Sequence, residues 1–319
     1  MNALSIYSEN NKNMSAGALY DSFIYPPFSL FDARAGWWQA RKKQWIKLGI
    51  DSGEGRKDHL MSGYANALTT WKRVKNSPTP QVDACFSKSI FDPVLTELMY
   101  AWFSPVGGKT LDPFAGGSVR GVVAALMDRK YTGVDISTTQ IDANELQASR
   151  FKFKHKPKWK EGDAARLHKA GIRGKYDFIF TCPPYGDLER YSDHPDDISN
   201  MPYEVFLGAF RQSVIDAARF LNDDCFACFV VGDFRDKNGT NRGFVADTIQ
   251  AGRDAGLNFY NDAILLTQAA SLPLRARGPF EGSRKLGKTH QNVLVFCKGD
   301  PKEATRKAGE VRPYSFPKN

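Results

Sequence analysis

From about residue 84 onward, short runs of apolar residues alternate with longer segments in which apolar residues recur every three to four positions. The short runs predict buried strands, and the longer segments predict amphipathic helices. The predicted strands cover residues 110–111, 131–134, 159–161, 176–181, 225–231, 259–266 and 293–297. The predicted helices cover residues 91–103, 119–129, 138–150, 202–221 and 244–255. This alternation predicts an α/β fold with a doubly wound, mostly parallel seven-stranded sheet.

The first 80 residues differ from this pattern, because they hold few aliphatic runs and several proline and glycine positions. They nevertheless carry four of the six tryptophans and the basic cluster of residues 41–43. We therefore expect an irregular N-terminal extension over residues 1–80, an α/β domain over residues 84–300 and a basic tail over residues 301–319.

Positive charge is concentrated in two stretches of the chain. The sequence holds 44 lysine and arginine residues against 35 aspartate and glutamate residues, which gives a net charge of +9. Residues 150–160 carry six cations and no acid, and residues 271–290 carry five cations and one acid. These two stretches account for the whole excess. Local clusters of this kind indicate a polyanionic partner, with nucleic acid as the first choice.

Hydropathy and cysteine spacing exclude several classes of protein. The longest wholly apolar run is residues 225–231, far short of the roughly 20 residues that a membrane-spanning helix needs. Residues 1–14 are polar, so we expect no signal peptide. The five cysteines are scattered, and Cys225 and Cys228 lie within an apolar strand. We therefore expect buried thiols, no metal site and a cytoplasmic location.

A glycine-rich turn at residues 112–118 is the first candidate site. It joins a predicted strand to a predicted helix, and its two consecutive glycines allow a ligand to approach the backbone closely. The turn lacks the lysine of a phosphate-binding loop, so Asp112 suits a cationic or hydroxyl-bearing ligand such as S-adenosylmethionine. Asp135 ends the next strand, where an acid binds a ribose diol in dinucleotide folds. Asp163 follows the third strand and can accept from an adenine amino group.

Residues 181–185, with the sequence Thr-Cys-Pro-Pro-Tyr, are the second candidate site. Two prolines directly after a buried strand force the backbone rigidly out of the sheet. Tyr185 beside this platform can stack on a planar ligand, although a strand-ending turn with a core tyrosine would have the same sequence. The motif lies one strand beyond Asp163, so we expect both sites at the carboxyl edge of one sheet.

The two motifs, in this order, resemble those of the amino-directed DNA methyltransferases. Residues 112–118 look like the Asp-Pro-Phe-x-Gly-Ser-Gly cofactor motif of that family, and residues 182–185 look like its catalytic Asp/Asn/Ser-Pro-Pro-Tyr/Phe/Trp motif. Residues 86–89 resemble the segment that closes over the methionine end of the cofactor. The resemblance covers roughly residues 84–300. In the N-terminal region, Gly36-Trp37-Trp38 and its surroundings look like stand-alone methylases of phages and prophages.

The resemblance implies a Rossmann-like methyltransferase that uses S-adenosylmethionine. The implied cofactor-binding residues are Phe86, Ser87, Lys88, Asp112, Pro113, Phe114, Gly116, Gly117, Ser118, Asp135, Ile136, Asp163 and Thr181. The implied catalytic residues are Cys182, Pro183, Pro184 and Tyr185. In the family, the first side chain of the catalytic motif and the carbonyl of its first proline accept the hydrogens of the target amino group. The aromatic residue stacks on the flipped base, and no covalent enzyme intermediate is needed.

Two positions depart from the pattern of the family. Cys182 stands where the family has Asp, Asn or Ser, and a thiol is a weak acceptor. Cysteine is nearest in size to Ser, which is commonest there in cytosine-N4 enzymes, so the sequence favours cytosine N4 over adenine N6. A cysteine could instead be the nucleophile of C5 methylation, although enzymes of that type place theirs after the prolines. Residues 117–118 read Gly-Ser where Ser-Gly is usual.

The sequence leaves the substrate open. RNA and protein N-methyltransferases carry similar sites, and a catalytically decayed DNA-binding module would also explain Cys182. The flexible, basic residues 271–290 suit phosphate contacts. The candidate DNA-binding residues there are Arg275, Arg277, Arg284, Lys285 and Lys288. Residues 150–160 are the second candidate for phosphate contacts, and residues 1–80 are a further candidate DNA-contacting region. Residues 191–200 suit a mobile lid near the base.

Overall fold

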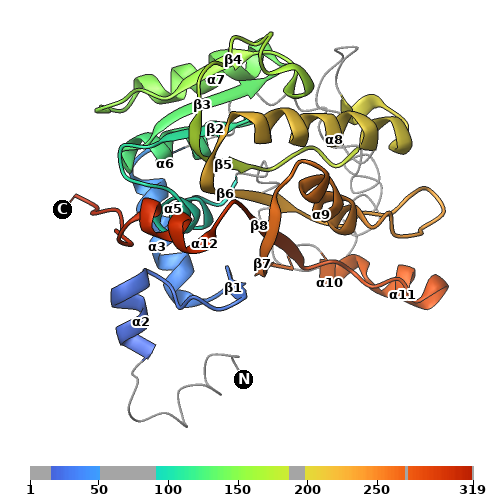
Figure 1. Cartoon of the computed structure of the whole chain (residues 1–319). Helices are drawn as coiled ribbons and strands as arrows, with labels where there is room; N and C mark the ends of the chain where they lie inside the picture. The colour runs from blue at the N-terminus through green and yellow to red at the C-terminus, as the bar shows by residue number, and fades with distance from the viewer. Residues whose placement is uncertain (1–15, 51–90, 187–197, 270–271, 318–319) are drawn as a thin grey trace.

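The computed structural model describes residues 16–50, 91–186, 198–269 and 272–317 (Figure 1). Eight strands in these residues form one sheet, in the order β1-β7-β8-β6-β5-β2-β3-β4. The strands are β1 Leu30–Asp32, β2 Lys109–Asp112, β3 Lys130–Asp135, β4 Lys158–Glu161, β5 Tyr176–Thr181, β6 Leu221–Val231, β7 Asn258–Leu266 and β8 His290–Lys298. Strand β8 runs antiparallel to β6 and β7, and the other neighbouring pairs are parallel.

The expected α/β fold with a mostly parallel sheet is confirmed, but the sheet has eight strands rather than seven. The additional strand, β1, comes from the N-terminal region and pairs in parallel with β7, where Leu30 lies opposite Ile264. Phe31 is the buried residue of this three-residue strand. A strand with one buried residue is too short to show an alternation of apolar and polar positions, so it leaves no recognisable pattern in the sequence.

Residues 16–50, the described part of the N-terminal region, form regular elements, whereas the rest of the expected irregular extension lies outside the described residues. Helix α2 covers Ala16–Phe23 and helix α3 covers Gly36–Lys47. Trp38 and Trp45 of α3 are fully buried. The ring of Tyr25 packs edge-on against Trp38, with centroids 5.5 Å apart. Aromatic side chains bury large apolar areas, so they stabilise a region that has few aliphatic residues.

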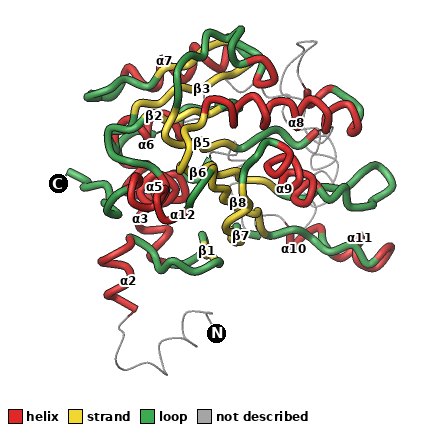
Figure 2. Tube along the Cα trace, in the orientation of Figure 1, coloured by secondary structure: helices red, strands yellow, loops and turns green. Residues whose placement is uncertain are grey.

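Helices cover both faces of the sheet (Figures 1 and 2). They are α5 Pro93–Phe103, α6 Val119–Leu126, α7 Thr138–Ser149, α8 Tyr203–Phe220, α9 Phe244–Asp254 and α12 Pro301–Ala308. Two further helices, α10 Leu272–Arg275 and α11 Arg277–Ser283, lie outside these layers (Figure 1). Alternate residues of β5 face the two layers, as the period of a strand requires. Phe178 and Phe180 lie in the buried cluster that includes α5 and α6, whereas Ile179 lies in the cluster that includes α8 and α9. A doubly wound sheet follows from this arrangement.

Helix α5 begins where the sequence predicts, because Asp92 caps it. The carboxylate of Asp92 accepts from the backbone N–H groups of Val94 at 2.9 Å and Leu95 at 3.2 Å. Pro93 occupies the first turn, where its missing N–H costs no helical hydrogen bond. The side chain of Asp92 also accepts from the indole of Trp38 at 3.2 Å, which joins α3 to the start of α5.

Buried Glu97 of α5 joins both ends of the described chain. Its carboxylate accepts from Arg41 at 2.6 Å and from the indole of Trp45 at 2.8 Å, both on α3. It also accepts from the backbone N–H of Tyr314 at 2.9 Å. The ring of Tyr314 stacks on Trp45, with centroids 4.6 Å apart. Part of the segment that we expected as a basic tail therefore packs against α3.

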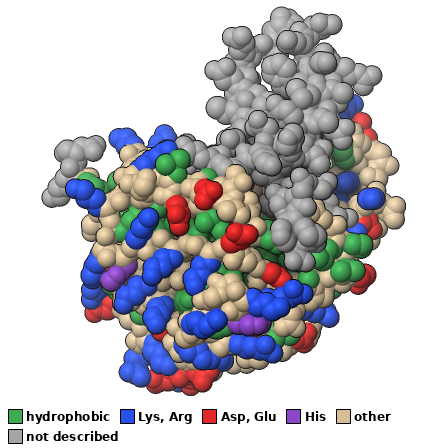
Figure 3. Space-filling view, turned by 90° about the horizontal axis from the view of Figure 1, so that it is seen from above, with side chains coloured by type: hydrophobic (Ala, Val, Ile, Leu, Met, Phe, Trp, Pro, Cys, Tyr) green, Lys and Arg blue, Asp and Glu red, His purple; other side chains and the backbone are tan. Residues whose placement is uncertain are grey.

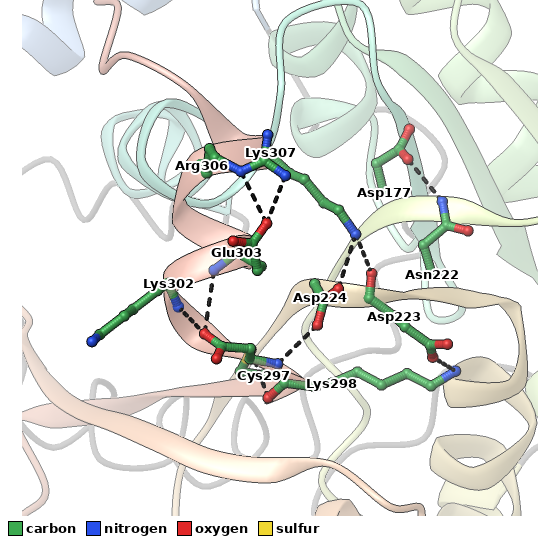
Figure 4. A network of polar contacts seen from close by, with 12 residues as sticks. Asp177, Asn222, Asp223, Asp224, Cys297, Lys298, Lys302, Glu303, Arg306 and Lys307 are labelled. Atoms are coloured by element: carbon green, nitrogen blue, oxygen red, sulfur yellow. Dashed lines mark hydrogen bonds and ion pairs between the residues drawn. The ribbon is translucent and has the colours of Figure 1, made fainter.

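Helix α12 is fixed to the start of β6 by a polar network (Figure 4). Lys307 Nζ donates to the carbonyl of Asp223 at 2.9 Å and lies 3.3 Å from a carboxylate oxygen of Asp224. That carboxylate also accepts from the backbone N–H of Asp300 at 2.9 Å. These contacts lie at the amino end of β6. They therefore support the fold at the edge of the sheet opposite to the candidate site.

Candidate active site

Both predicted motifs lie at the carboxyl edge of the sheet, as expected. Strands β2, β3, β4 and β5 are mutually parallel, so their carboxyl ends meet at this edge. Strand β2 ends in the turn of residues 112–118, and its neighbour β5 ends in the motif of residues 181–185. Asp135 ends β3, and Asp163 follows β4. Phe86, Ser87 and Lys88 lie outside the described residues.

Asp112 is fully buried and serves as an acceptor for three side chains. One carboxylate oxygen accepts from the hydroxyl of Thr181 at 2.7 Å. The other accepts from Arg120 Nε at 2.6 Å and from the hydroxyl of Tyr131 at 2.9 Å. We expected this carboxylate to face a cationic ligand. Instead the protein itself supplies the cation and two hydroxyl donors, so Asp112 organises the surrounding elements, and its contact with a ligand stays a prediction.

Arg120, on the first turn of α6, is a buried cation that the sequence did not single out. Besides its bond to Asp112, its guanidinium donates to the carbonyls of Phe114 at 2.7 Å and Ala115 at 2.9 Å. It lies 4.5 Å from the ring centroid of Phe91. Burial lowers the pKa of Arg120, but the charge of Asp112, together with Tyr131, Cys182 and the hydrogen bond to Asp112, outweighs burial, so the pKa is raised. Arg120 therefore stays charged, and its hydrogen bonds to two carbonyls hold the glycine-rich turn in place.

The turn of residues 112–118 is also held from the side of β3. The carboxylate of Asp135 accepts from the backbone N–H of Gly116 at 2.8 Å and of Ser137 at 2.9 Å. Gly116 has a φ of +49°, a conformation that side chains disfavour, and its carbonyl accepts from Asn144 at 2.7 Å. Asp135, at the position predicted for a ribose, is only half-buried.

The remaining predicted cofactor positions lie around the same turn. Pro113 and Ser118 are buried, whereas Phe114, Gly117 and Ile136 are partly exposed. The hydroxyl of Ser118 is buried without a hydrogen-bond partner among the described residues.

Asp163 caps the short helix η1 (Ala164–Arg166) that follows β4. Its carboxylate accepts from the backbone N–H of Ala165 at 2.8 Å and lies 3.8 Å from Arg166 Nε. The neighbouring Gly162 donates its N–H to the carbonyl of Asp135 at 2.9 Å. The three acids therefore differ: Asp112 is enclosed, whereas Asp135 and Asp163 are partly exposed.

The predicted catalytic motif leaves β5 through a buried Thr181 and a half-buried Cys182. The Cys182 side chain is not part of a disulfide, packs against the buried cluster that includes α5 and lies near enough to Arg120 for the two to interact electrostatically. Pro183 is buried and Pro184 is half-buried, so the chain is held rigidly as it leaves the sheet. Because β5 pairs with β2, residues 182–185 follow the strand next to the one that ends in the turn of residues 112–118.

Tyr185 is oriented by contacts that the sequence did not reveal. Its hydroxyl accepts from Gln291 Nε2 at 2.7 Å. Its ring meets the rings of Phe234 and Phe244 edge-on, with centroids 6.2 Å away in each case. Gln291 lies near the start of β8, and because β8 is antiparallel its start lies at the carboxyl edge. One side of the Tyr185 ring is thus packed, and the residue is half-buried.

A basic arm, residues 272–288, projects from this edge between β7 and β8 and carries α10 and α11 (Figure 1). A hydrogen bond of 2.9 Å between the N–H of Thr267 and the carbonyl of Thr289 closes its base. Lys288 at the base donates to the carbonyl of Asp233 at 3.1 Å, and desolvation lowers the pKa of its ammonium group. A Cβ atom on Gly232 would lie 3.3 Å from Lys288 Nζ and 3.8 Å from the Tyr185 hydroxyl, which places the arm's base beside the catalytic motif.

The other predicted DNA-binding residues lie farther out on the arm. Arg275, Arg277, Arg284 and Lys285 are all exposed. Arg277 pairs with Glu281 at 2.7 Å, and the Arg284 guanidinium lies 5.2 Å from the ring centroid of Phe280. The structure thus separates Lys288, close to Tyr185, from four exposed outer cations, of which Arg277 is paired with Glu281.

The second basic stretch, residues 150–160, lies at the other end of the sheet. It leads into β4, the edge strand, which is separated from β5 by β2 and β3. Phe151 and Phe153 stack with centroids 5.9 Å apart, and Lys154 pairs with Asp128 at 2.8 Å. The face viewed in Figure 3, which bears α7 and β4, displays many lysine and arginine side chains with acids among them. Of the expected lid at residues 191–200, only residues 198–200 are described, as the helix η3.

No helix in the described part of the chain is long and apolar enough to cross a membrane. The same residues hold no group of three or more His, Cys, Asp or Glu side chains arranged to bind a metal ion.

The chain matches no family model and no curated protein. Among solved structures, TrmN from Thermus thermophilus is similar with a TM-score of 0.45 and 15% identity, over 67% of this chain and 51% of TrmN. Magnesium protoporphyrin IX methyltransferase from Synechocystis with bound SAM is similar with a TM-score of 0.42 and 12% identity, over 76% of this chain and 95% of that protein. A candidate DNA modification methylase, also from Thermus thermophilus, has a TM-score of 0.33 and 21% identity, over 44% of this chain and 52% of that protein. This chain spans about half the length of TrmN.

Proposed function

We propose that this protein is a DNA methyltransferase that uses S-adenosylmethionine to methylate an exocyclic amino group of a flipped base, with cytosine N4 favoured over adenine N6. The observation that carries the proposal is the 2.7 Å hydrogen bond from Thr181 to Asp112. It joins the cofactor-type turn after β2 to the catalytic-type motif after β5. A methyl donor on one motif and an acceptor amino group on the other would therefore be neighbours, as methyl transfer requires.

The residues at the carboxyl edge fit the proposed cofactor. Asp135 is partly exposed and suits the two ribose hydroxyls, while Asp163 suits the adenine amino group. The positive φ of Gly116 opens the turn, and a Cβ atom there would meet nothing within 4 Å, so the backbone is accessible to a ligand. When bound, the cofactor supplies an electrophilic methyl group on a sulfonium centre.

The catalytic motif would act by positioning and by accepting hydrogen bonds. An exocyclic amino nitrogen is a poor nucleophile, because its lone pair is delocalised into the ring. The carbonyl of Pro183 and the sulfur of Cys182 would accept its two hydrogens, which returns electron density to the nitrogen. Tyr185 would stack on the base, with its hydroxyl held by Gln291. Such rigid acceptors need no reorganisation at the moment of transfer.

DNA is the substrate that the charge distribution favours. The basic arm starts beside Tyr185 and presents exposed arginine and lysine side chains within reach of a phosphate backbone. We assign catalysis to residues 84–300 and treat the N-terminal region as a second DNA-contacting region.

The proposal is tested by incubating the full chain with methyl-labelled S-adenosylmethionine and, in parallel, unmethylated plasmid DNA, total RNA or a protein extract. We expect label in DNA, with a matched Tyr185→Ala variant giving none. Label in RNA or protein alone would overturn the choice of substrate. Cofactor binding without label in any of the three would favour a decayed DNA-binding module.

A further inference from the structure

The basic arm exposes two leucines to an unusual degree. Leu274 is 89% exposed and Leu286 is 71% exposed, and they are the most exposed of the large apolar side chains in the described residues. Phe280, on the same arm, is also exposed. Single exposed apolar residues are common on protein surfaces, but several on one projecting segment indicate a binding surface.

Cations surround these apolar side chains. Arg275 follows Leu274 directly, and Arg284 and Lys285 precede Leu286. Glu281, the acid of this segment, is paired with Arg277. The arm therefore carries exposed apolar side chains with cations next to them in the sequence, and Leu274 and Leu286 lie close to its base. That combination is complementary to a DNA duplex, which has anionic phosphates outside and apolar base faces inside.

The base of the arm lies close to Tyr185, the residue proposed to stack on the flipped base. The base of the arm is closed at Thr267 and Thr289, and Lys288 lies near the Tyr185 hydroxyl. Near that base, Leu272 packs against Gly287, where a Cβ atom would lie only 2.5 Å from the leucine side chain. The close approach clamps the two ends of the arm together. The exposed leucines are thus carried on a segment anchored at the catalytic motif.

We propose that Leu274 and Leu286 form an apolar wedge that inserts between base pairs next to the flipped base. This inference rests on the proposed function, because a base that leaves the stack opens a gap beside it. Proteins that open or kink DNA commonly insert leucine or other apolar side chains between base steps. The outer cations would hold the phosphates on either side while the leucines take the place of the flipped base in the stack.

The wedge is tested by DNA unwinding, which needs neither a known recognition site nor turnover. Relaxed plasmid is saturated with the full chain, treated with topoisomerase I and freed of protein, and its linking number is measured. We expect the wild type to lower the linking number. At equal occupancy, the decrease caused by the Leu274→Ser/Leu286→Ser variant should be about one third of the wild-type decrease. The matched control is Leu146→Ser, an exposed leucine on α7, which should behave as the wild type.

Three results would overturn the wedge: no unwinding by the wild type, equal unwinding by the double variant, or wild-type dimers that the double variant abolishes. The last would make the leucines a contact between copies of this chain. Failure of the wedge is distinguishable from failure of the proposed function, because methyl transfer to DNA is measured separately. Circular dichroism checks that the variants are folded, as both leucines lie at the surface.

Discussion

The hydroxyl of Thr181 donates a 2.7 Å hydrogen bond to the carboxylate of Asp112, although the two residues lie on different strands and far apart in the sequence. Both groups are fully buried. The bond connects the last residue of β5 to the last residue of β2 and so sets the distance between the two motifs. A buried donor and acceptor without partners would be costly, so this contact favours one arrangement of the site.

The first prediction concerns this bond. Thr181→Val keeps the shape of the side chain but removes the donor, and it should cost about 1–3 kcal/mol of unfolding free energy. Because the motifs would lose their common anchor, we expect turnover to fall roughly tenfold to a hundredfold. Thr181→Ser, which keeps the hydroxyl, is the control. Urea unfolding and initial rates measure both effects, and a Val variant as active as Ser would refute the coupling.

Arg120 and Asp112 form a buried ion pair that should be sensitive to removal of either partner. Arg120→Met leaves the Asp112 carboxylate without its cation and should cost about 3–5 kcal/mol. The double variant Arg120→Met/Asp112→Asn removes the stranded charge as well, so part of the loss should be recovered. Equal stability of the single and double variants, measured by urea unfolding, would show that the charge of Asp112 is not held by Arg120.

Tyr185 and Gln291 provide a test of how the base would be held. Tyr185→Ala should abolish turnover and leave cofactor binding largely intact. Gln291→Leu removes the donor to the Tyr185 hydroxyl and should lower turnover about tenfold with little change in cofactor affinity. Isothermal titration with the cofactor separates the two effects. Loss of cofactor binding in either variant would mean that these residues lie in the cofactor site instead.

Two buried thiols should make the fold sensitive to alkali. Desolvation raises the pKa of Cys225 and of Cys297 to about 11, above the value of 9.0 expected in the unfolded chain. The folded state therefore retains these protons longer, so their contribution to stability is complete below about pH 9 and is lost as the pH rises through 11. Comparing urea unfolding of the wild type and a Cys225→Ala/Cys297→Ala variant at pH 8 and pH 11 isolates this contribution. An unchanged pH dependence would contradict it.

The outer cations of the basic arm should determine the salt dependence of DNA binding. Replacing Arg275, Arg284 and Lys285 with Gln should lower the slope of log affinity against log salt by roughly 0.9 for each phosphate that the arm no longer binds. The matched control replaces Lys152, Lys154 and Lys156, at the distant edge of the sheet, with Gln. A larger change in the control would move the DNA-binding surface to the face around β4.

Much of the fold followed from the sequence, because long elements leave periodic patterns. The strand of residues 176–181 appears as predicted, and the helix predicted over residues 91–103 is present as Pro93–Phe103. Parallel strands then bring Asp135, Asp163 and the Cys182 motif to one edge without further information. Strand β1 could not be predicted in this way, because Phe31 alone is its buried residue.

The contacts within the site were harder to predict, because they depend on packing between distant segments. From the sequence alone, Arg120 resembles an ordinary surface cation within an apolar helix. Only the fold shows that it is buried beside Asp112. Gln291 meets Tyr185 only because β8 is antiparallel and begins at the carboxyl edge. Neither contact has a local pattern, and each requires the strand order to be known first.

The identity of the methylated nucleoside distinguishes amino-group methylation from the other reactions of a methyltransferase. Unmethylated plasmid DNA is incubated with the full chain and labelled S-adenosylmethionine, digested, and its nucleosides are identified by mass. The account predicts N4-methylcytosine, with N6-methyladenine as the other product of an amino-directed site. Label confined to 5-methylcytosine would make Cys182 a nucleophile and contradict the amino-group mechanism, and no labelled nucleoside would contradict the proposed function itself.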